Sequence, residues 1–183
     1  MKKFLVLLLI LIIAPLIGGL YGIIHDQLTY TISPEYYTKF KFYQFGLIES
    51  GYETVFPNPR LQVSIIGFMA IWWMGVPIGL ILGLTGLIHR SGKSMFKVTL
   101  QAFLVTMLVA FFTGLIGLTY GMFYLSGTGV DWLFPENLID KESFIAVGSM
   151  HNFSYLGGLV GMIAGIIFSV REKRKLQTLT LAH

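Results

Sequence analysis

The pattern of hydrophobic and polar positions divides the chain into four long stretches that contain no Asp, Glu, Lys or Arg. These stretches are residues 4–25, 61–89, 98–130 and 143–170. A helix that crosses a membrane needs about 20 mostly apolar residues, and each stretch reaches that length. The pattern predicts transmembrane helices at residues 4–24, 61–88, 98–125 and 143–170. The third is expected to end near Leu125, because Gly127 and Gly129 follow it.

The segment at residues 25–60, between the first two predicted helices, is rich in aromatic residues. Ser33, Pro34 and Glu35 form a typical helix start, with an N-cap, a proline in the first turn and an early acid. After them, aromatic residues recur at helical spacing, whereas the alternation over residues 39–42 would equally suit a strand. We expect a short interfacial helix, because aromatic and Lys side chains favour the headgroup region.

The composition agrees with a chain surrounded mostly by lipid. Hydrophobic residues make up 55% of the chain and charged residues 12%, against about 25% charged in a typical soluble domain. This composition argues against a disordered chain, a nucleic-acid-binding tail and a soluble α/β enzyme. We predict an all-α integral membrane four-helix bundle, a single transmembrane domain over residues 1–183. Residues 25–60 would form a partly helical extracytoplasmic cap and residues 171–183 a tail. Pro15 should kink its helix, and Pro15 and Pro77, which lie between Gly-rich turns, fit the broken helices of transporters.

The charges fall unevenly on the two sides of the predicted helices. The side that carries both termini holds nine Lys and Arg residues and one acid, and the other side holds four basic residues and eight acids. Because basic loops stay in the cytoplasm, we expect both termini there, with the first helix as an uncleaved signal anchor. The basic residues thus set orientation and indicate no nucleic-acid partner. The chain contains no Cys, which excludes disulfides and thiolate metal sites.

Glycines recur at every fourth position in two of the predicted helices. Gly75, Gly79 and Gly83 lie in the second helix, and residues 157, 161 and 165 repeat the pattern in the fourth. Such rows let helix backbones approach closely in lipid. Their partners lie either within the chain or in another subunit, and we expect a homo-oligomer or partner membrane subunits held through these Gly-rich faces.

Polar residues inside a predicted membrane span are costly and mark candidate sites. His151 is the strongest candidate, with Asn152 beside it and Tyr155 on the same face. It is either a ligand, proton carrier or metal donor, or a neutral side chain that ties two helices together. Its neighbour Met150 would suit copper, although Met residues more often fill a core.

His25 and Asp26 close the first predicted helix on the same outer side. They form either an interfacial cap or a pair that accepts a proton or binds a metal. Neighbouring residues on a helix diverge by about 100°, so sharing one ion is expected to need a break in the helix. The sharper hypothesis places several side chains in one outward-facing pocket: His25, Asp26, His151, Tyr155, Tyr120, Tyr124 and an acid such as Glu35 or Glu53.

Other candidates concern larger cofactors. Trp72 and Trp73 lie near the middle of the second helix, and at least one is expected to face the bundle. There it would either pack or stack on a quinone, porphyrin or lipid headgroup. A haem between His25 and His151 would need the two helices staggered by about two turns. His89, at the opposite membrane face, is expected to be interfacial.

Residues 25–46 (HDQLTYTISPEYYTKFKFYQFG) and 150–158 (MHNFSYLGG) resemble small four-span bacterial membrane proteins of uncharacterised function. The resemblance implies a bacterial inner-membrane location and supplies no catalytic residue. Common hydrolase and nucleotide-binding motifs are missing from the sequence. We therefore expect a non-enzymatic transport or accessory subunit that binds an ion, proton or small ligand in the outer pocket. The alternatives are a redox or enzymatic protein with haem, quinone or a transition metal, and a structural scaffold.

Overall fold

The computed structural model describes residues 2–49 and 56–181, with side chains described as far as residue 175. Over these ranges the long elements are helices and no strand forms. Four helical segments are long and apolar enough to cross a membrane: Lys3–Ile32, Pro59–Gly86, Gly92–Thr128 and Lys141–Lys175. The all-α four-span prediction is confirmed.

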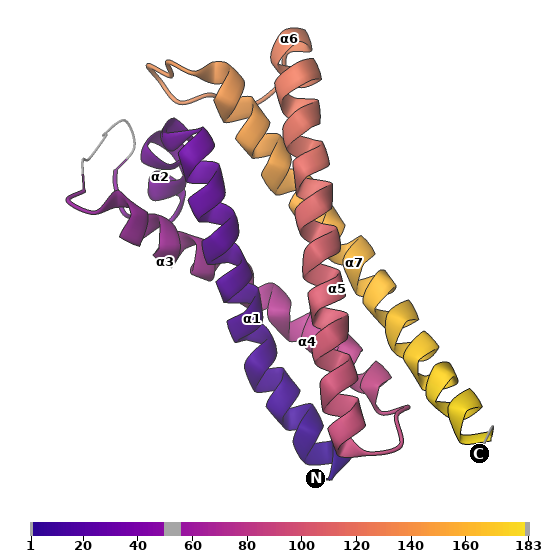
Figure 1. Cartoon of the computed structure of the whole chain (residues 1–183). Helices are drawn as coiled ribbons and strands as arrows, with labels where there is room; N and C mark the ends of the chain where they lie inside the picture. Colours follow the sequence, from indigo (N-terminus) through magenta and orange to yellow (C-terminus); the bar gives the residue numbers. More distant parts are fainter. Residues whose placement is uncertain (1, 50–55, 182–183) are drawn as a thin grey trace.

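The long helices associate as two pairs. Helix α1 (Lys3–Ile32) packs along α3 (Pro59–Ile71) and α4 (Gly75–Gly86), and α5 (Gly92–Tyr120) packs along α7 (Lys141–Leu181). Helix α1 begins and α7 ends at the same end of the molecule, which Figure 1 shows at the bottom. We call this the basic end, because it holds Arg90 and Lys93. The opposite end, with α2 (Phe42–Gln44) and α6 (Ser126–Thr128), is the cap end.

Three of the helices were predicted too short. Helix α1 continues beyond residue 24 to Ile32, because polar side chains in its last turns bond to its own backbone, as Thr31 Oγ1 does to the carbonyl of Gln27 at 2.9 Å. Helix α5 begins at Gly92 instead of residue 98, capped by Ser91, which accepts the N–H of Ser94 at 3.2 Å. Helix α7 begins at Lys141 and runs to Leu181, so the predicted tail is helical to that point.

The second membrane span is broken, as its proline predicts. A 3₁₀ turn at Trp72–Met74 separates α3 from α4, and Pro77 follows within one turn. Pro77 has no N–H for the carbonyl of Trp73, and its ring crowds that carbonyl in a regular helix. The Trp73 carbonyl accepts instead from the N–H of Gly75. Helix α1, by contrast, continues through Pro15 without an interruption.

The cap helix forms where it is predicted, but it is not a surface element. Residues Tyr36–Lys41 form a π-helical turn (η1) that leads into α2, so the strand alternative is wrong. Tyr36, Tyr37 and Phe42 are buried. They belong to a cap cluster that joins the cap to α3 and α7, made of Tyr36, Tyr37, Phe42, Val63, Ile66, Phe144 and Val147. Aromatic side chains on several faces of this turn make burial more favourable than an interfacial position.

A second core lies toward the basic end. This basic-end cluster consists of Val6, Ile10, Ala14, Leu82, Met95, Ala102 and Phe103, so α1, α4 and α5 meet there. The two helix pairs are therefore joined by one cluster at each end. The polar residues discussed below lie on α1 and α7 between these two clusters.

The glycine rows pack within the chain. A Cβ on Gly75 would meet the backbone of Ala14 on α1, and a Cβ on Gly161 would meet the backbone of Thr106 on α5. At the crossing of α1 and α3, a Cβ on Gly22 would collide with the carbonyl oxygen of Gly67. Because α1 and α5 cover these rows, contacts with partner subunits would have to use other faces.

Candidate functional site

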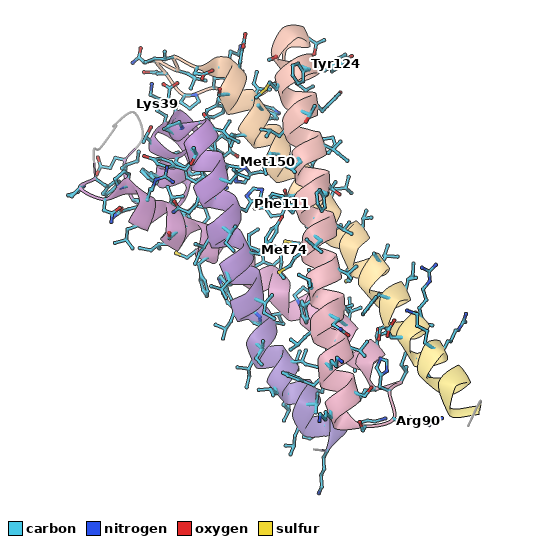
Figure 2. The ribbon with its side chains drawn as sticks, viewed as in Figure 1. Lys39, Met74, Arg90, Phe111, Tyr124 and Met150 are labelled. Carbon is cyan, nitrogen blue, oxygen red and sulfur yellow. The ribbon has the colours of Figure 1, made fainter. Side chains whose placement is uncertain are left out.

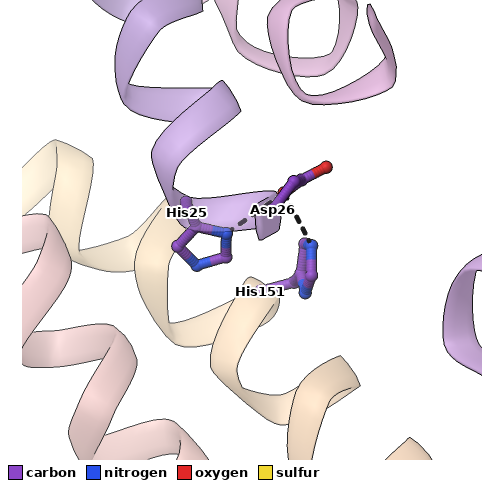
Figure 3. Close-up of side chains that lie close together, drawn as sticks. All are labelled: His25, Asp26 and His151. Atoms are coloured by element: carbon purple, nitrogen blue, oxygen red, sulfur yellow. Dashed lines mark hydrogen bonds and ion pairs between the residues drawn. The ribbon is translucent and has the colours of Figure 1, made fainter. Parts of the chain in front are cut away.

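His25 and Asp26 from α1 meet His151 from α7 between the two helix pairs. His25 Nδ1 lies 3.2 Å and His151 Nε2 lies 3.3 Å from the same oxygen, Asp26 Oδ1, and Figure 3 shows the three side chains converging. All are buried, with exposed fractions of 4%, 2% and 6% for His25, Asp26 and His151. Their possible ligand atoms all lie within 4.8 Å of one another.

This geometry corrects two expectations about His25 and Asp26. They do not cap the end of the first helix, because α1 continues for more than a turn beyond them. They also share one site without a break in α1. Adjacent side chains leave a helix about 100° apart. The two side chains nevertheless meet, because the imidazole of His25 extends far enough to contact the Asp26 carboxylate.

The backbone fixes the proton position on the His151 ring. His151 Nδ1 lies 2.9 Å from the carbonyl oxygen of Val147, and a carbonyl only accepts, so Nδ1 carries the hydrogen. In a neutral ring, Nε2 then presents a lone pair to Asp26 Oδ1. Neither His151 Nε2 nor Asp26 Oδ2 has a hydrogen-bond partner within the described chain. The gap between His151 and Asp26 is thus electrostatically suited to a positive charge.

Ser154 links the site to a second turn of α7. Its Oγ lies 3.0 Å from His25 Nε2 and is buried with it. His25 Nδ1 faces the Asp26 carboxylate, so Nδ1 is the donor in that contact and Nε2 accepts from the Ser154 hydroxyl when the ring is neutral. Each imidazole of the site therefore has one nitrogen toward Asp26 and the other held by α7.

Aromatic side chains cover the site on the cap side. The Tyr36 ring stacks on His151 with centroids 5.0 Å apart, and Phe144 lies 5.0 Å from Tyr36. Burial raises the pKa of Tyr36 and Tyr37 above the ordinary value, and the charge of Asp26 raises both further. Burial lowers the pKa of Lys41, against the opposing effect of Asp26. The Asp26 charge thus reaches the cap through a poorly hydrated region.

A cavity of about 70 Å³ lies on the other side of the three residues. Its polar end is formed by His25, Asp26, His151, Ser154, Tyr155 and Tyr21. Apart from Thr106, the rest of its wall is apolar and includes Ile17, Met74, Ile78, Phe103, Met107 and Ala110. In Figure 2, Met74 lies in the region between α1 and α5. The cavity holds a small group. His25 Nδ1 and His151 Nε2 both face Asp26 Oδ1, so the two imidazoles are not arranged as opposite axial ligands of a haem.

Of the predicted pocket residues, His25, Asp26, His151 and Tyr155 gather as expected. Asn152 is exposed, because adjacent positions on α7 face different directions. Tyr120 stacks on Tyr124 at 5.2 Å on an exposed face, and Figure 2 shows Tyr124 at the cap end. Asn152, Tyr120 and Tyr124 are therefore not part of the site.

Neither Trp72 nor Trp73 faces the bundle, contrary to the prediction. Their exposed fractions are 43% and 54%. The Trp73 indole N–H donates to the carbonyl of Ala70 at 2.9 Å, so its own helix satisfies the polar group that was expected to need an interhelical partner. Both tryptophans lie outside the cavity wall.

The remaining candidates lie elsewhere. Glu35 accepts from Lys39 Nζ at 2.5 Å and from the N–H of Asp140 at 2.7 Å, so it fastens the cap to the loop before α7. Glu53 lies outside the described residues. His89 follows the second span at the basic end and is buried, 3.0 Å from Ser169 Oγ. Burial lowers the pKa of His89 below its ordinary value, and Lys173 and Lys3 lower it further.

Sequence reasoning missed Tyr21 and Ser154 as members of the site. Tyr21 is one helical turn before His25, and Ser154 is one turn after His151. The helical spacing of i and i+3 or i+4 was the available signal. Helical spacing could not show that α1 packs against α7 or that these turns face the contact between the two helices.

The site thus combines two imidazoles and a carboxylate from two helix pairs, with a small cavity beside them. The three residues could hold a metal ion, and their types are those found at zinc sites. Comparisons with protein-family models, curated proteins and solved structures find no match for this chain.

Proposed function

We propose that this protein is a small membrane transport or accessory subunit that binds a divalent transition-metal ion, of the Zn²⁺ class, at His25, Asp26 and His151. The supporting observation is the spacing of the donors. Bonds of about 2.0–2.1 Å to Zn²⁺ in tetrahedral geometry place neighbouring ligand atoms about 3.3 Å apart. The two separations to Asp26 Oδ1 are 3.2 and 3.3 Å.

The surroundings of both imidazoles support a metal. Histidines that bind a metal commonly donate their other ring N–H to a carbonyl, carboxylate or water. His151 does this through the Val147 carbonyl, which leaves its Nε2 lone pair free for an ion. To bind an ion through Nδ1, which faces the shared carboxylate, the His25 ring moves its hydrogen to Nε2 and donates it to Ser154 Oγ, 3.0 Å away. A metal would also neutralise Asp26, whose buried charge is otherwise costly in a membrane span.

The placement of the donors favours a role that involves movement or assembly. His25 and Asp26 belong to the α1 pair and His151 to the α7 pair, so an ion at this point would join the two halves. That is the property expected of a site whose loading changes the relative position of helices. As an accessory subunit, the protein would contact partners or a second copy through lipid-facing side chains other than the glycine rows.

For orientation, we propose a bacterial inner membrane with both termini in the cytoplasm. The basic end carries most of the Lys and Arg residues, which favours the cytoplasmic side. The cap would then face outward, and the metal site would lie in the outer half of the membrane. The bacterial assignment follows from the resemblance of residues 25–46 and 150–158.

Metal analysis tests the proposed function. The full chain is purified in mild detergent, stripped of metal and titrated with Zn²⁺ or Co²⁺ at fixed pH. We expect one ion per chain and Co²⁺ absorption bands of a four- or five-coordinate site, both lost in His151→Gln and kept in the control Asn152→Gln, which changes an exposed neighbour. Failure of the parent protein to bind either ion, or unchanged binding in His151→Gln, would refute the proposal.

A further inference from the structure

We infer that the metal keeps an exchangeable position toward the cavity, and that this position takes the oxygen-donor head of a small amphiphile dissolved in the bilayer. This inference rests on the proposed function and specifies the ligand of the same site. Three protein donors leave a position open on a four-coordinate ion, as in zinc sites that bind water or substrate.

The polar end of the cavity has unsatisfied hydrogen-bonding capacity. Tyr21 lines the cavity with His25 and His151, and its buried hydroxyl lies near Ser154 but makes no hydrogen bond of standard geometry in the part of the chain that the structure describes. Buried polar atoms without partners are rare in proteins and usually indicate a ligand, ion or water. A donor head bound at the open position would lie in the same polar end as this hydroxyl.

Access from the cap end is blocked. Tyr36 stacks on His151, and Tyr36 and Phe144 are both almost fully buried, at 6% and 4% exposed. The apolar walls of the cavity, by contrast, include residues that are only partly buried: Ile17, Ala70, Ile71, Met74, Ile78 and Met107. A ligand therefore enters through the membrane-facing side, which selects molecules that dissolve in lipid.

The size of the cavity limits how much of the ligand it can enclose. The volume of about 70 Å³ is several times the roughly 10–15 Å³ that one water needs on the same measure. It encloses a donor head and its first carbons, and the remainder of the chain would lie along the apolar wall toward lipid. The occupant is thus a small oxygen donor, such as a hydroxamate, carboxylate or phenol group, on an unbranched apolar chain.

A hydroxamate series on the Co²⁺-loaded protein tests this inference. Acetohydroxamate and octanohydroxamate present the same donor atoms with different tails, and binding is followed through the Co²⁺ absorption bands. We expect octanohydroxamate to bind at least about tenfold more tightly, since each buried CH₂ contributes about fourfold. Two matched variants distinguish binding of the tail in the cavity from partitioning of the ligand into the detergent micelle. They are Ile17→Phe and Leu20→Phe, because Ile17 lines the cavity and Leu20 faces lipid.

Ile17→Phe should remove most of the advantage of the long tail, and Leu20→Phe should keep it. Met107→Phe, on the opposite wall, serves if Ile17→Phe fails to fold. Equal affinities for the two hydroxamates, unchanged bands with both, or equal behaviour of the two α1 variants would overturn the inference while leaving the metal site intact. If Co²⁺ itself does not bind, the proposed function fails and this inference fails with it.

Discussion

His151 Nε2 lies 3.3 Å from Asp26 Oδ1, although the two residues belong to different helix pairs and are far apart in the sequence. The hydrogen bond from His151 Nδ1 to Val147 directs the other ring nitrogen, without a hydrogen in the neutral ring, at the carboxylate. Two lone pairs that face each other in a buried site repel unless a positive charge lies between them. This contact is the basis of the metal assignment.

Zinc should stabilise the folded protein through this contact. Binding to the folded state alone contributes about 2.7 kcal/mol when the free ion is at about 100 times its Kd. We therefore expect Zn²⁺ to raise the Tm of the parent protein in detergent by several degrees. In Asp26→Asn, which keeps the shape of the side chain but removes its charge, the increase should disappear. An equal increase in both proteins would show that the ion acts elsewhere.

Ser154 should affect metal affinity without contacting the ion. Its hydroxyl orients His25 at 3.0 Å, and loss of such outer-shell bonds commonly weakens metal binding about 10–100-fold. We predict this loss for Ser154→Ala in a competition titration with a zinc indicator. Ser149→Ala is the matched control, because Ser149 is also buried on α7 and its hydroxyl has no hydrogen-bond partner among the described residues. Similar losses in both variants would argue against an orienting role.

Glu35 should make the stability of the cap dependent on pH. Burial opposes ionisation, but Lys39 and the N–H groups of Asp140 and Ile139 prevail and lower the pKa of Glu35 below its ordinary value of 4.5. The stabilisation is therefore complete above about pH 4.5 and is lost as the pH falls through the lowered value. Thermal unfolding between pH 3 and 6 should show a shallower pH dependence in Glu35→Gln than in the parent.

The control for Glu35 is Glu136→Gln, which removes an exposed carboxylate from the loop that Glu35 holds. It should leave the pH dependence unchanged. If Glu35→Gln and the parent lose stability in parallel over this range, the contacts of Glu35 with Lys39 and Asp140 do not contribute to the stability of the cap.

The crossing of α1 and α3 should tolerate no side chain at Gly22. A Cβ there would collide with the carbonyl oxygen of Gly67, and overpacking of this kind commonly costs about 1–3 kcal/mol. Gly22→Ala should therefore lower the Tm by several degrees. Gly127→Ala is the control, because a Cβ at that position has no neighbour within 4 Å. Equal effects would mean that helix propensity, and not the close crossing, decides the result.

Much of the fold follows from local sequence patterns. The absence of charge over long stretches predicts the four spans, and Pro77 predicts the break in the second. The first boundary was wrong because His25 and Asp26 were treated as residues that leave the membrane, whereas burial against α7 allows them inside α1. Polarity alone does not distinguish a residue at the membrane surface from one that has a partner within the bundle.

The sequence predicts most of the residues that form the candidate site but not how they are arranged. His25, Asp26, His151 and Tyr155 follow from their depth in the predicted spans. The prediction that Tyr120 and Asn152 belong to the site was wrong, because the depth of a residue in a span does not show in which direction its side chain points. That direction relative to the site depends on which helices pack together. The Val147 contact of His151 follows from local helix geometry, but its consequence for Asp26 appears only when α1 and α7 are placed together.

X-ray absorption of the zinc-loaded full chain tests the central claim most directly. The account predicts nitrogen and oxygen ligands at about 2.0–2.1 Å, with outer-shell scattering from two imidazoles that falls to one in any zinc retained by His151→Gln. A zinc ion surrounded by oxygen alone, without imidazole scattering in the parent protein, would contradict the assignment of His25, Asp26 and His151 as its ligands.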